Sequence, residues 1–305
     1  MQPAIPVPPT PIVERPFSRM DQPFPWPNGA RCAVMLTFDF DAETLWFSRD
    51  PDNARKPGVL SQGVYGGRVG VHKVLDLMKE EGTPATFFTP GWTIERYPQA
   101  VERILAEGHE LGHHGYLHEW IDPDFPEKEE EAMSKGLEAM QRVVGVTPRG
   151  FRSPAGESSS NMIRLLTEKG FLYDSTLMDG IVPYRHELAD GRPGVVEIPW
   201  HWSLDDAPMA LFSVRNPRTI QPNSHILECW LEEFHEIYRW GGLVDVVMHP
   251  QISGRPSRIA NLRRFIEEVR RLPGVWFATG TEIAEAYVAA EAALAAKARQ
   301  DASHG

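Results

Sequence analysis

The sequence predicts an α/β fold in which about seven parallel strands form a barrel within a single domain. Short apolar runs alternate with stretches of helical periodicity along nearly the whole chain, which is typical of βα units. The 305 residues exceed the size of one ordinary domain, yet no linker divides the chain after Arg31. Seven such units favour a closed barrel, although the length alone also permits a doubly wound open sheet.

Seven apolar runs are expected to be strands, because each is short and is followed by a polar or glycine-containing segment. They are Cys32 to Phe38, Ala85 to Phe88, Glu110 to Gly112, Gly150 to Phe151, Val195 to Ile198, Leu243 to Met248 and Val275 to Ala278.

Five amphipathic segments between these runs are expected to be helices, because their apolar residues recur every three or four positions and can pack on a sheet. Their apolar positions are Val71, Val74, Leu75 and Met78; Val101, Ile104 and Leu105; Met133, Leu137, Met140 and Val144; Ile226, Trp230, Phe234 and Ile237; Ile259, Leu262, Phe265, Ile266 and Val269.

Two tails flank the predicted barrel, which spans residues 31–284. Residues 1–30 form a proline-rich arm with nine prolines in the first 27 positions, Pro8 and Pro9 among them. We expect this arm to drape over its own domain through Phe17, Phe24 and Trp26, the alternative being contact with a neighbouring molecule. Residues 285–305 are expected to form an Ala-rich C-terminal helix and tail.

The composition argues against two classes of partner. A formal charge of −11 repels phosphate backbones and anionic membranes, and no apolar run reaches the ~18 residues of a membrane span. The start of the chain lacks the pattern of a signal peptide. Cys32 and Cys229 are the only cysteines, both in apolar stretches that indicate core positions, which fits a reducing compartment. We therefore expect a cytoplasmic protein with no nucleic-acid or membrane partner.

Acidic residues follow the first predicted strand. Strand periodicity would direct Asp39, Asp41 and Glu43 to the same side, where clustered carboxylates raise one another's pKa unless a cation is present. This segment alone permits two interpretations. The acids are either solvated residues where a strand passes into a loop, or metal ligands. Metal ligation needs a partner elsewhere.

Histidines at the end of the third run supply that partner. His114 and His118 are four apart, so one helical turn would bring both imidazoles to one face, as in helix-borne zinc pairs. A His-x-x-x-His pair alone is a weak signal. The adjacent His113 should point elsewhere, as a packing residue.

Arg152 and His249 extend the pattern, because each follows a predicted strand. Together with Asp39, Asp41, His114 and His118, they all fall just past the carboxyl ends of strands, which is the active-site face of a barrel. Their convergence by chance is improbable.

These residues carry a family resemblance. From Arg31 to about Ala284 the chain resembles the polysaccharide deacetylase (NodB-like) superfamily, particularly the branch that contains cytoplasmic peptidoglycan deacetylase-like proteins, cyclic imide hydrolases and allantoinases. The family fold is a distorted (β/α) barrel of about seven strands. The matching stretches are Thr37 to Glu43, His114 to His118, Arg152 to Gly156, Glu197 to Pro199, Leu243 to Pro250 and Gly254 to Arg258.

The resemblance implies a role for each matched residue. A divalent metal ion, most simply Zn²⁺, would bind Asp41, His114 and His118. Asp39 would act as general base and His249 as general acid. Arg152 would orient Asp39, and the backbone N–H of Ala155 would help to hold the oxyanion.

Two departures from the family pattern bear on the substrate. Phe40 separates the usual pair of adjacent aspartates, as in the imide and allantoin branch and in one deacetylase branch. Ala155 stands where an aromatic residue commonly follows the Arg-x-Pro. Both weaken the case for simple sugar deacetylation.

The chemistry fits metal-assisted hydrolysis of a non-peptide amide, because an ion with three protein ligands leaves positions for water and a carbonyl. We expect deacetylation of an N-acetyl sugar, with hydrolysis of a cyclic imide or ureide as the alternative. The segment from Trp200 to Asp206 should lie at the barrel mouth and suits either substrate. The expected substrate-binding residues are Tyr116, Ala155, Trp202 and Asp205.

Other interpretations remain. Two histidines and a carboxylate also describe non-haem iron oxygenases, but those occur on double-sheet β folds. A non-catalytic carbohydrate-binding protein would leave the acid, base and ligand set unexplained. The metal-independent allantoinases typically lack one ligand position, whereas all three remain here. The resemblance and the proline-rich arm also suggest a homo-oligomer, such as a tetramer.

Overall fold

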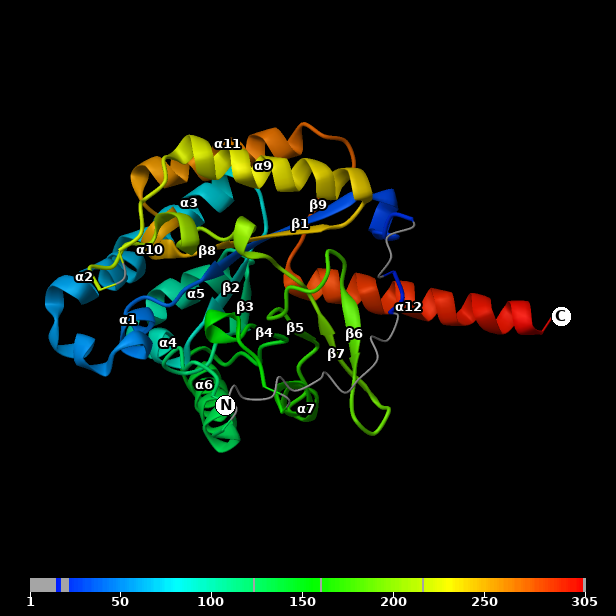
Figure 1. Ribbon diagram of the computed structural model, residues 1–305, viewed down its shortest axis with the longest axis horizontal. Coiled ribbons are helices and arrows are strands. Elements are labelled where there is room, and N and C mark those ends of the chain that lie inside the picture. The colour runs from blue at the N-terminus through cyan, green and yellow to red at the C-terminus, as the bar shows by residue number, and fades with distance from the viewer. Residues whose placement is uncertain (1–14, 18–21, 123, 160, 216, 304–305) are drawn as a thin grey trace, which may run out of the picture.

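The computed structural model describes residues 15–17, 22–122, 124–159, 161–215 and 217–303. Most of the expected proline-rich arm, including Pro8 and Pro9, lies outside the described residues. The described part forms one twisted sheet covered by helices, and α12 extends from it at the C-terminus (Figure 1).

The sheet has nine strands, most of them very short. They are β1 (Cys32–Asp39), β2 (Thr86–Thr89), β3 (Glu110–His113), β4 (Gly150–Phe151), β5 (Tyr173–Asp174), β6 (Tyr184–Glu187), β7 (Pro193–Glu197), β8 (Leu243–Met248) and β9 (Val275–Phe277).

The helices alternate with these strands and cover the sheet. They are α1 (Thr44–Arg49), α2 (Pro57–Tyr65), α3 (Val71–Glu81), α4 (Gly91–Arg96), α5 (Pro98–Ala106), α6 (Pro126–Val144), α7 (Met162–Glu168), α8 (Ala207–Ala210), α9 (Asn223–Trp240), α10 (Pro250–Ser253), α11 (Pro256–Arg270) and α12 (Gly280–Ala302). The five predicted helices are thereby confirmed as α3, α5, α6, α9 and α11.

The strand order is β6-β7-β5-β4-β3-β2-β1-β8, with β9 paired to β1, and every pair is parallel except β6 with β7. The α/β class and the parallel sheet are confirmed, and all seven predicted runs are strands. The sequence missed β5 and the antiparallel edge strand β6. Among the described residues no strand pair joins β8 to β6 or β7; instead Asp205, in the segment after β7, forms an isolated bridge to Val247 of β8.

The central strand β1 is buried on both faces, which explains its nearly continuous apolar sequence. Val34, Leu36 and Phe38 pack in the layer beneath the helices, and Ala33 and Met35 pack in the interior cluster on the other face. Because β1 is fixed on both sides, the residues that follow its carboxyl end have a well-defined position.

The two cysteines differ in burial. Cys32 is buried in β1, as expected, but Cys229 of α9 is only partly buried, because it lies toward the edge of the helix's apolar face. Both thiols are free. Within the described ranges, no helix combines the length and apolar character needed to cross a membrane.

Aromatic residues before β1 pack against the C-terminal helix. The ring of Phe24 lies 4.8 Å from that of Phe17 and 6.3 Å from that of Tyr287 in α12. The indole N–H of the buried Trp26 donates to the carbonyl of Gly241 at 3.0 Å. The helix α12 begins at Gly280, five residues before the expected C-terminal tail. Tyr287, which lies within that expected tail, packs against Phe24.

Trp26→Ala should lower the free energy of unfolding by about 3–5 kcal/mol, because it removes a large buried side chain and its hydrogen bond to the Gly241 carbonyl. Urea unfolding followed by circular dichroism measures the change. Trp240→Ala is the matched control, since Trp240 is 52% exposed at the end of α9. Equal losses from the two variants would show that the segment before β1 contributes nothing specific to stability.

Candidate active site

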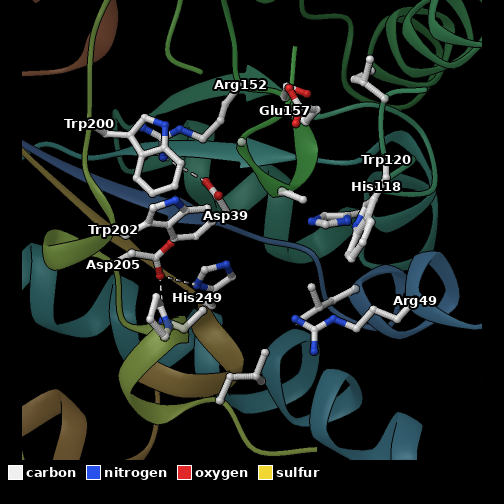
Figure 2. A pocket seen from close by; sticks show the side chains of 18 of the residues that line it. Asp39, Arg49, His118, Trp120, Arg152, Glu157, Trp200, Trp202, Asp205 and His249 are labelled. Atoms are coloured by element: carbon white, nitrogen blue, oxygen red, sulfur yellow. Dashed lines mark hydrogen bonds and ion pairs between the residues drawn. The ribbon is translucent and has the colours of Figure 1, made fainter. Parts of the chain in front are cut away.

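A cavity of about 450 Å³ opens at the carboxyl ends of the strands. Figure 2 shows polar side chains from several strand ends directed into it beside Trp200 and Trp202. The expected site residues that line it are Asp39, His118, Arg152, Ala155, Trp202, Asp205 and His249.

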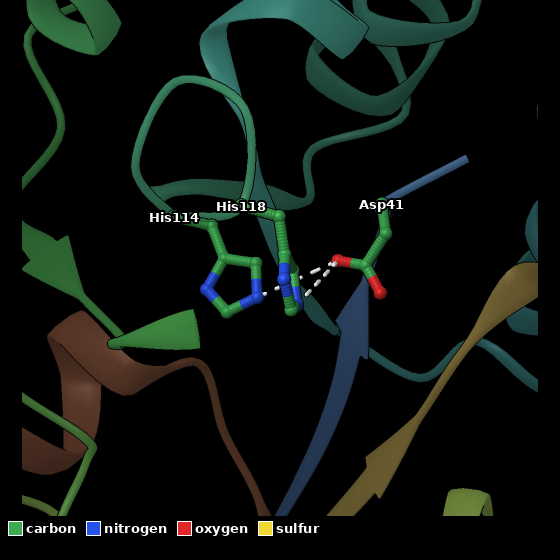
Figure 3. Close-up of side chains that lie close together, drawn as sticks. All are labelled: Asp41, His114 and His118. Atoms are coloured by element: carbon green, nitrogen blue, oxygen red, sulfur yellow. Dashed lines mark ion pairs between the residues drawn. The ribbon is translucent and has the colours of Figure 1, made fainter. Parts of the chain in front are cut away.

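Asp41, His114 and His118 meet beside this cavity, as Figure 3 shows. The Nε2 atoms of the two histidines lie 3.4 Å and 3.9 Å from Oδ1 of Asp41. All three side chains are buried. Both carboxylate oxygens of Asp41 and Nε2 of His114 have no hydrogen-bond partner among the described residues. Such atoms are costly to bury unless a ligand satisfies them.

Neighbouring groups orient the two imidazoles. Nδ1–H of His114 donates to the backbone carbonyl of Arg152 at 2.7 Å. Nδ1 of His118 lies 3.1 Å from the hydroxyl of Ser48, which itself donates to the Leu45 carbonyl. With Nδ1 carrying the proton, each Nε2 lone pair is free to bind a cation, the usual outer-shell arrangement of metal-binding histidines.

The donor set fits a divalent cation. Burial raises the pKa of Asp41 well above its usual value and lowers that of His118 well below, so both groups favour their neutral forms when no ion is bound. A cation reverses this for the carboxylate and binds neutral imidazoles directly. Two nitrogens and one oxygen form a common zinc ligand set.

Two other groups of potential ligands fit a cation less well. Glu197, near Asp174 and His186, already accepts hydrogen bonds from two backbone N–H groups and contacts His186. Asp206, near Asp205, is similarly engaged by several donors around His249. Among the described residues of these three groups, Asp41 alone has both carboxylate oxygens without a hydrogen-bond partner.

The spacing of His114 and His118 arises from a loop, not from the expected helical turn. None of the described residues between β3 and α6 is helical. Gly115 and His118 adopt positive φ angles of 72° and 59°, and the Glu119 carboxylate accepts the backbone N–H groups of Tyr116 and Leu117. These bonds close a tight turn that brings the two imidazoles together.

Strand periodicity also stops earlier than expected. The strand β1 ends at Asp39, and Ala42 has a φ of 50°, so the chain turns before α1. Asp39 and Asp41 face the site, whereas Glu43 points away and accepts a hydrogen bond from the Tyr97 hydroxyl at 2.7 Å.

Arg152 is buried and fully bonded. Its guanidinium donates five hydrogen bonds, to the side chains of Thr37, Asp39 and Asp245 and to the hydroxyl and carbonyl of Ser175. Burial raises the pKa of Asp39, but Arg152, through its charge and its hydrogen bond, together with His114 and His249 outweighs this effect, and the pKa is lowered overall. Asp39 is therefore ionised and able to accept a proton.

His249 is held by Asp206. Its Nδ1 lies 2.7 Å from one carboxylate oxygen, and its backbone N–H and the Ser253 hydroxyl donate to the other. Burial alone would lower the pKa of His249, yet Asp206 and the nearby Asp205 raise it well above its ordinary value. Its Nε2 faces Asp41 at 3.7 Å, so a protonated His249 presents a donor to the site.

The remaining expected residues divide between the cavity and its surroundings. Ala155 has a φ of 60°, a strained conformation for a residue with a side chain, in the turn over Arg152. Trp202 contacts Trp200 edge-on at the rim. Tyr116 does not line the cavity, since the loop turns its hydroxyl outward to Glu95. His113 packs against Phe151, as expected.

Sequence reasoning missed the residues that hold the functional groups. Ser48 and Glu119 had no distinguishing pattern. Asp245 was visible as the single charge within an otherwise apolar strand, and Asp206 as one of two adjacent acids. Both of these charges are buried at the site, and each is bonded to a cationic or ionisable side chain.

The chain is similar in sequence to a known protein family and to proteins of known name. A sequence model of the polysaccharide deacetylase family matches residues 29–173. The chain is 30% identical over 282 residues to a peptidoglycan deacetylase of Helicobacter pylori, covering 84% of this chain and 96% of the relative. A peptidoglycan deacetylase-like protein of Gibberella zeae is 27% identical and covers 85% and 87% of the two chains.

Solved structures agree. A Mycobacterium smegmatis structure described as a polysaccharide deacetylase has a TM-score of 0.81 at 41% identity, covering 86% of this chain and 92% of its own. An allantoinase superposes with a TM-score of 0.76 at 25% identity, covering 88% and 94%. With its match over nearly the whole Helicobacter relative, this chain belongs to the polysaccharide deacetylase family and is a hydrolase of amide C–N bonds.

Proposed function

We propose that the protein removes the acetyl group from an N-acetylated amino sugar, with a divalent ion held by Asp41, His114 and His118. The unpartnered carboxylate of Asp41, buried and facing two imidazole nitrogens, is the observation that carries the proposal. The names of the Helicobacter and Gibberella relatives support the glycan substrate.

We propose that the ion is Zn²⁺. When bound, it would act as a Lewis acid on both the amide carbonyl and the attacking water. Asp39 accepts the proton of the attacking water, because Arg152 keeps its carboxylate ionised. The backbone N–H of Ala155, which lines the cavity in a strained turn, donates to the oxygen that becomes negative as the carbonyl is attacked.

Protonated His249 donates from Nε2 to the nitrogen that leaves. Asp206 fixes the ring through Nδ1 and stabilises the charged form. Trp202 and Asp205, at the cavity wall, bind the sugar ring. Asp39 and His249 therefore divide the base and acid roles through opposite electrostatic environments.

A second candidate is hydrolysis of a cyclic imide or ureide. The fold similarity to an allantoinase supports it, as do Phe40 between the two aspartates and Ala155 at the cavity wall. Such substrates are flat rings of a size that the cavity accommodates.

We further propose that the protein is cytoplasmic and forms a homo-oligomer, such as a tetramer, as the family resemblance suggests. Two free cysteines suit a reducing compartment. Light scattering measures the assembly directly: a mass several times 34.4 kDa is expected, and a monomer at micromolar concentration would contradict it.

His118→Ala should reduce the metal content of the purified protein to well below one ion per chain, since it removes one of three ligands. Elemental analysis by mass spectrometry measures the ratio. His225→Ala, an exposed histidine on α9, is the control and should retain full metal. Undiminished metal in His118→Ala would show that the ion binds elsewhere.

Asp39→Asn should keep its metal but lose turnover by about 10²–10⁴-fold, the range of a positioned proton-transfer group. A near-normal kcat with the metal still bound would show that Asp39 is not the general base and that another carboxylate has this role. Steady-state kinetics paired with metal analysis separates these outcomes.

The pH profile of kcat/KM should be bell-shaped. The lowered pKa of Asp39 extends activity to acidic pH, and the raised pKa of His249 keeps the acid protonated above its ordinary range. Asp206→Asn removes the charge that raises the pKa of His249, so the alkaline limb should move to lower pH. An alkaline limb at the same pH in this variant would exclude His249 as its origin.

The substrate class is tested by assaying the metal-loaded protein with N-acetylglucosamine oligomers, succinimide, dihydrouracil and allantoin. Release of acetate from the oligomers is the expected result, and the Asp39→Asn protein is the blank. Ring opening without acetate release would replace the proposal with the second candidate.

A further inference from the structure

We propose that the substrate carries an acidic group, a carboxylate or a phosphate, which binds Arg49 and Arg218 while the scissile amide lies at Asp39 and His249. This inference rests on the proposed amide hydrolysis and names the charge class of its substrate.

The two arginines come from separate segments and reach the same cavity. Arg49 is the last residue of α1, and Arg218 belongs to the segment between α8 and α9. Both line the cavity together with His118 and His249. Figure 2 shows the Arg49 guanidinium directed into the cavity from α1.

Neither guanidinium has a protein partner within the described ranges, where no hydrogen bond or ion pair involves Arg49 or Arg218. Their neighbours are paired: Arg215 and Lys56 both form ion pairs with Asp50, the residue after Arg49. The acid nearest in sequence is therefore already occupied by two cations. Asp41 attracts Arg49 through its charge but forms no ion pair with it in the described part of the chain.

The acidic residues that line the cavity serve other partners or lie apart. Asp39 binds Arg152, and Asp205 accepts the backbone N–H of Ala207 at 2.6 Å. Glu157 lies on the other side of His118 from Arg49 in Figure 2. Hence the cavity does not itself supply a carboxylate to the arginine pair.

The positive charges of Arg49 and Arg218 repel each other and make the electrostatic potential at this side of the cavity positive. Partial burial and the charge of Arg218 lower the pKa of Arg49, and the opposing attraction of Asp41 does not restore it. An anion bound between them would relieve this repulsion and would gain charge-assisted hydrogen bonds from two planar donors. Both side chains are open to solvent, so a ligand can reach them.

The opposite wall is apolar and aromatic, formed by Trp200 and Trp202. A ring lying against these indoles would have its acidic substituent toward the arginines and its acylated nitrogen near His249. The cavity thus favours a small acidic N-acyl compound, such as an amino sugar with a carboxylate ether or a phosphate, over a neutral oligomer.

The test compares N-acetylglucosamine, N-acetylmuramic acid and N-acetylglucosamine 6-phosphate as substrates of the metal-loaded protein. N-acetylmuramic acid tests for recognition of a carboxylate, and N-acetylglucosamine 6-phosphate tests separately for recognition of a phosphate. At least one acidic sugar should have a kcat/KM about tenfold or more above that of the neutral sugar, and Arg49→Gln and Arg218→Gln should each lower this ratio about tenfold, mainly through KM. Arg299→Gln, on the exposed end of α12, should keep the wild-type ratio.

An equal loss of kcat on neutral and acidic sugars in Arg49→Gln would mean that Arg49 acts on the reacting carbonyl, and it would overturn the proposal. The same sugars are also titrated calorimetrically into the metal-loaded Asp39→Asn protein, with and without Arg49→Gln. Tighter binding of an acidic sugar that Arg49→Gln abolishes supports the inference even if no sugar is hydrolysed. Equal affinity for acidic and neutral sugars contradicts it, whether or not deacetylation occurs.

Discussion

The buried guanidinium of Arg152 is the charge around which the site is organised. It joins Thr37 and Asp39 of β1, Ser175 after β5 and Asp245 of β8, three parts of the sheet that are far apart in sequence. A buried arginine without partners would be very costly, so these bonds must form together with the fold. Because its own carbonyl also accepts Nδ1–H of His114, the same residue sets the charge of the proposed base and the orientation of a proposed metal ligand.

The three acidic residues between positions 39 and 43 consequently have three different environments. Asp39 is ionised by Arg152, Asp41 is left without a hydrogen bond, and Glu43 turns outward to Tyr97. The turn at Ala42 separates them. Of the five residues other than glycine with positive φ in the described part of the chain, Ala42, His118 and Ala155 adjoin the site, which is where backbone strain commonly has a functional role.

The sequence was sufficient for the long, strongly patterned elements and for the residues that meet at the strand ends. It failed where periodicity carries no information. The strand β5 has two residues, and β6 carries charged side chains at the sheet edge, so neither shows a strand pattern. The pairing of His114 with His118 was anticipated from helical spacing, although a loop closed by Glu119 produces it. Tyr116, which was expected to bind substrate, lies in the same loop but directs its hydroxyl to Glu95. Partners such as Ser48 and Asp206 depend on tertiary contacts that one sequence does not reveal.

The most direct test of this account is a crystal structure of the metal-loaded protein with anomalous scattering measured at the zinc absorption edge. The account predicts one strong peak about 2.0–2.2 Å from a carboxylate oxygen of Asp41 and from Nε2 of His114 and His118. A peak instead at Asp174, His186 and Glu197, at Asp205, Asp206 and His249, or no peak in protein that is catalytically active, would contradict it.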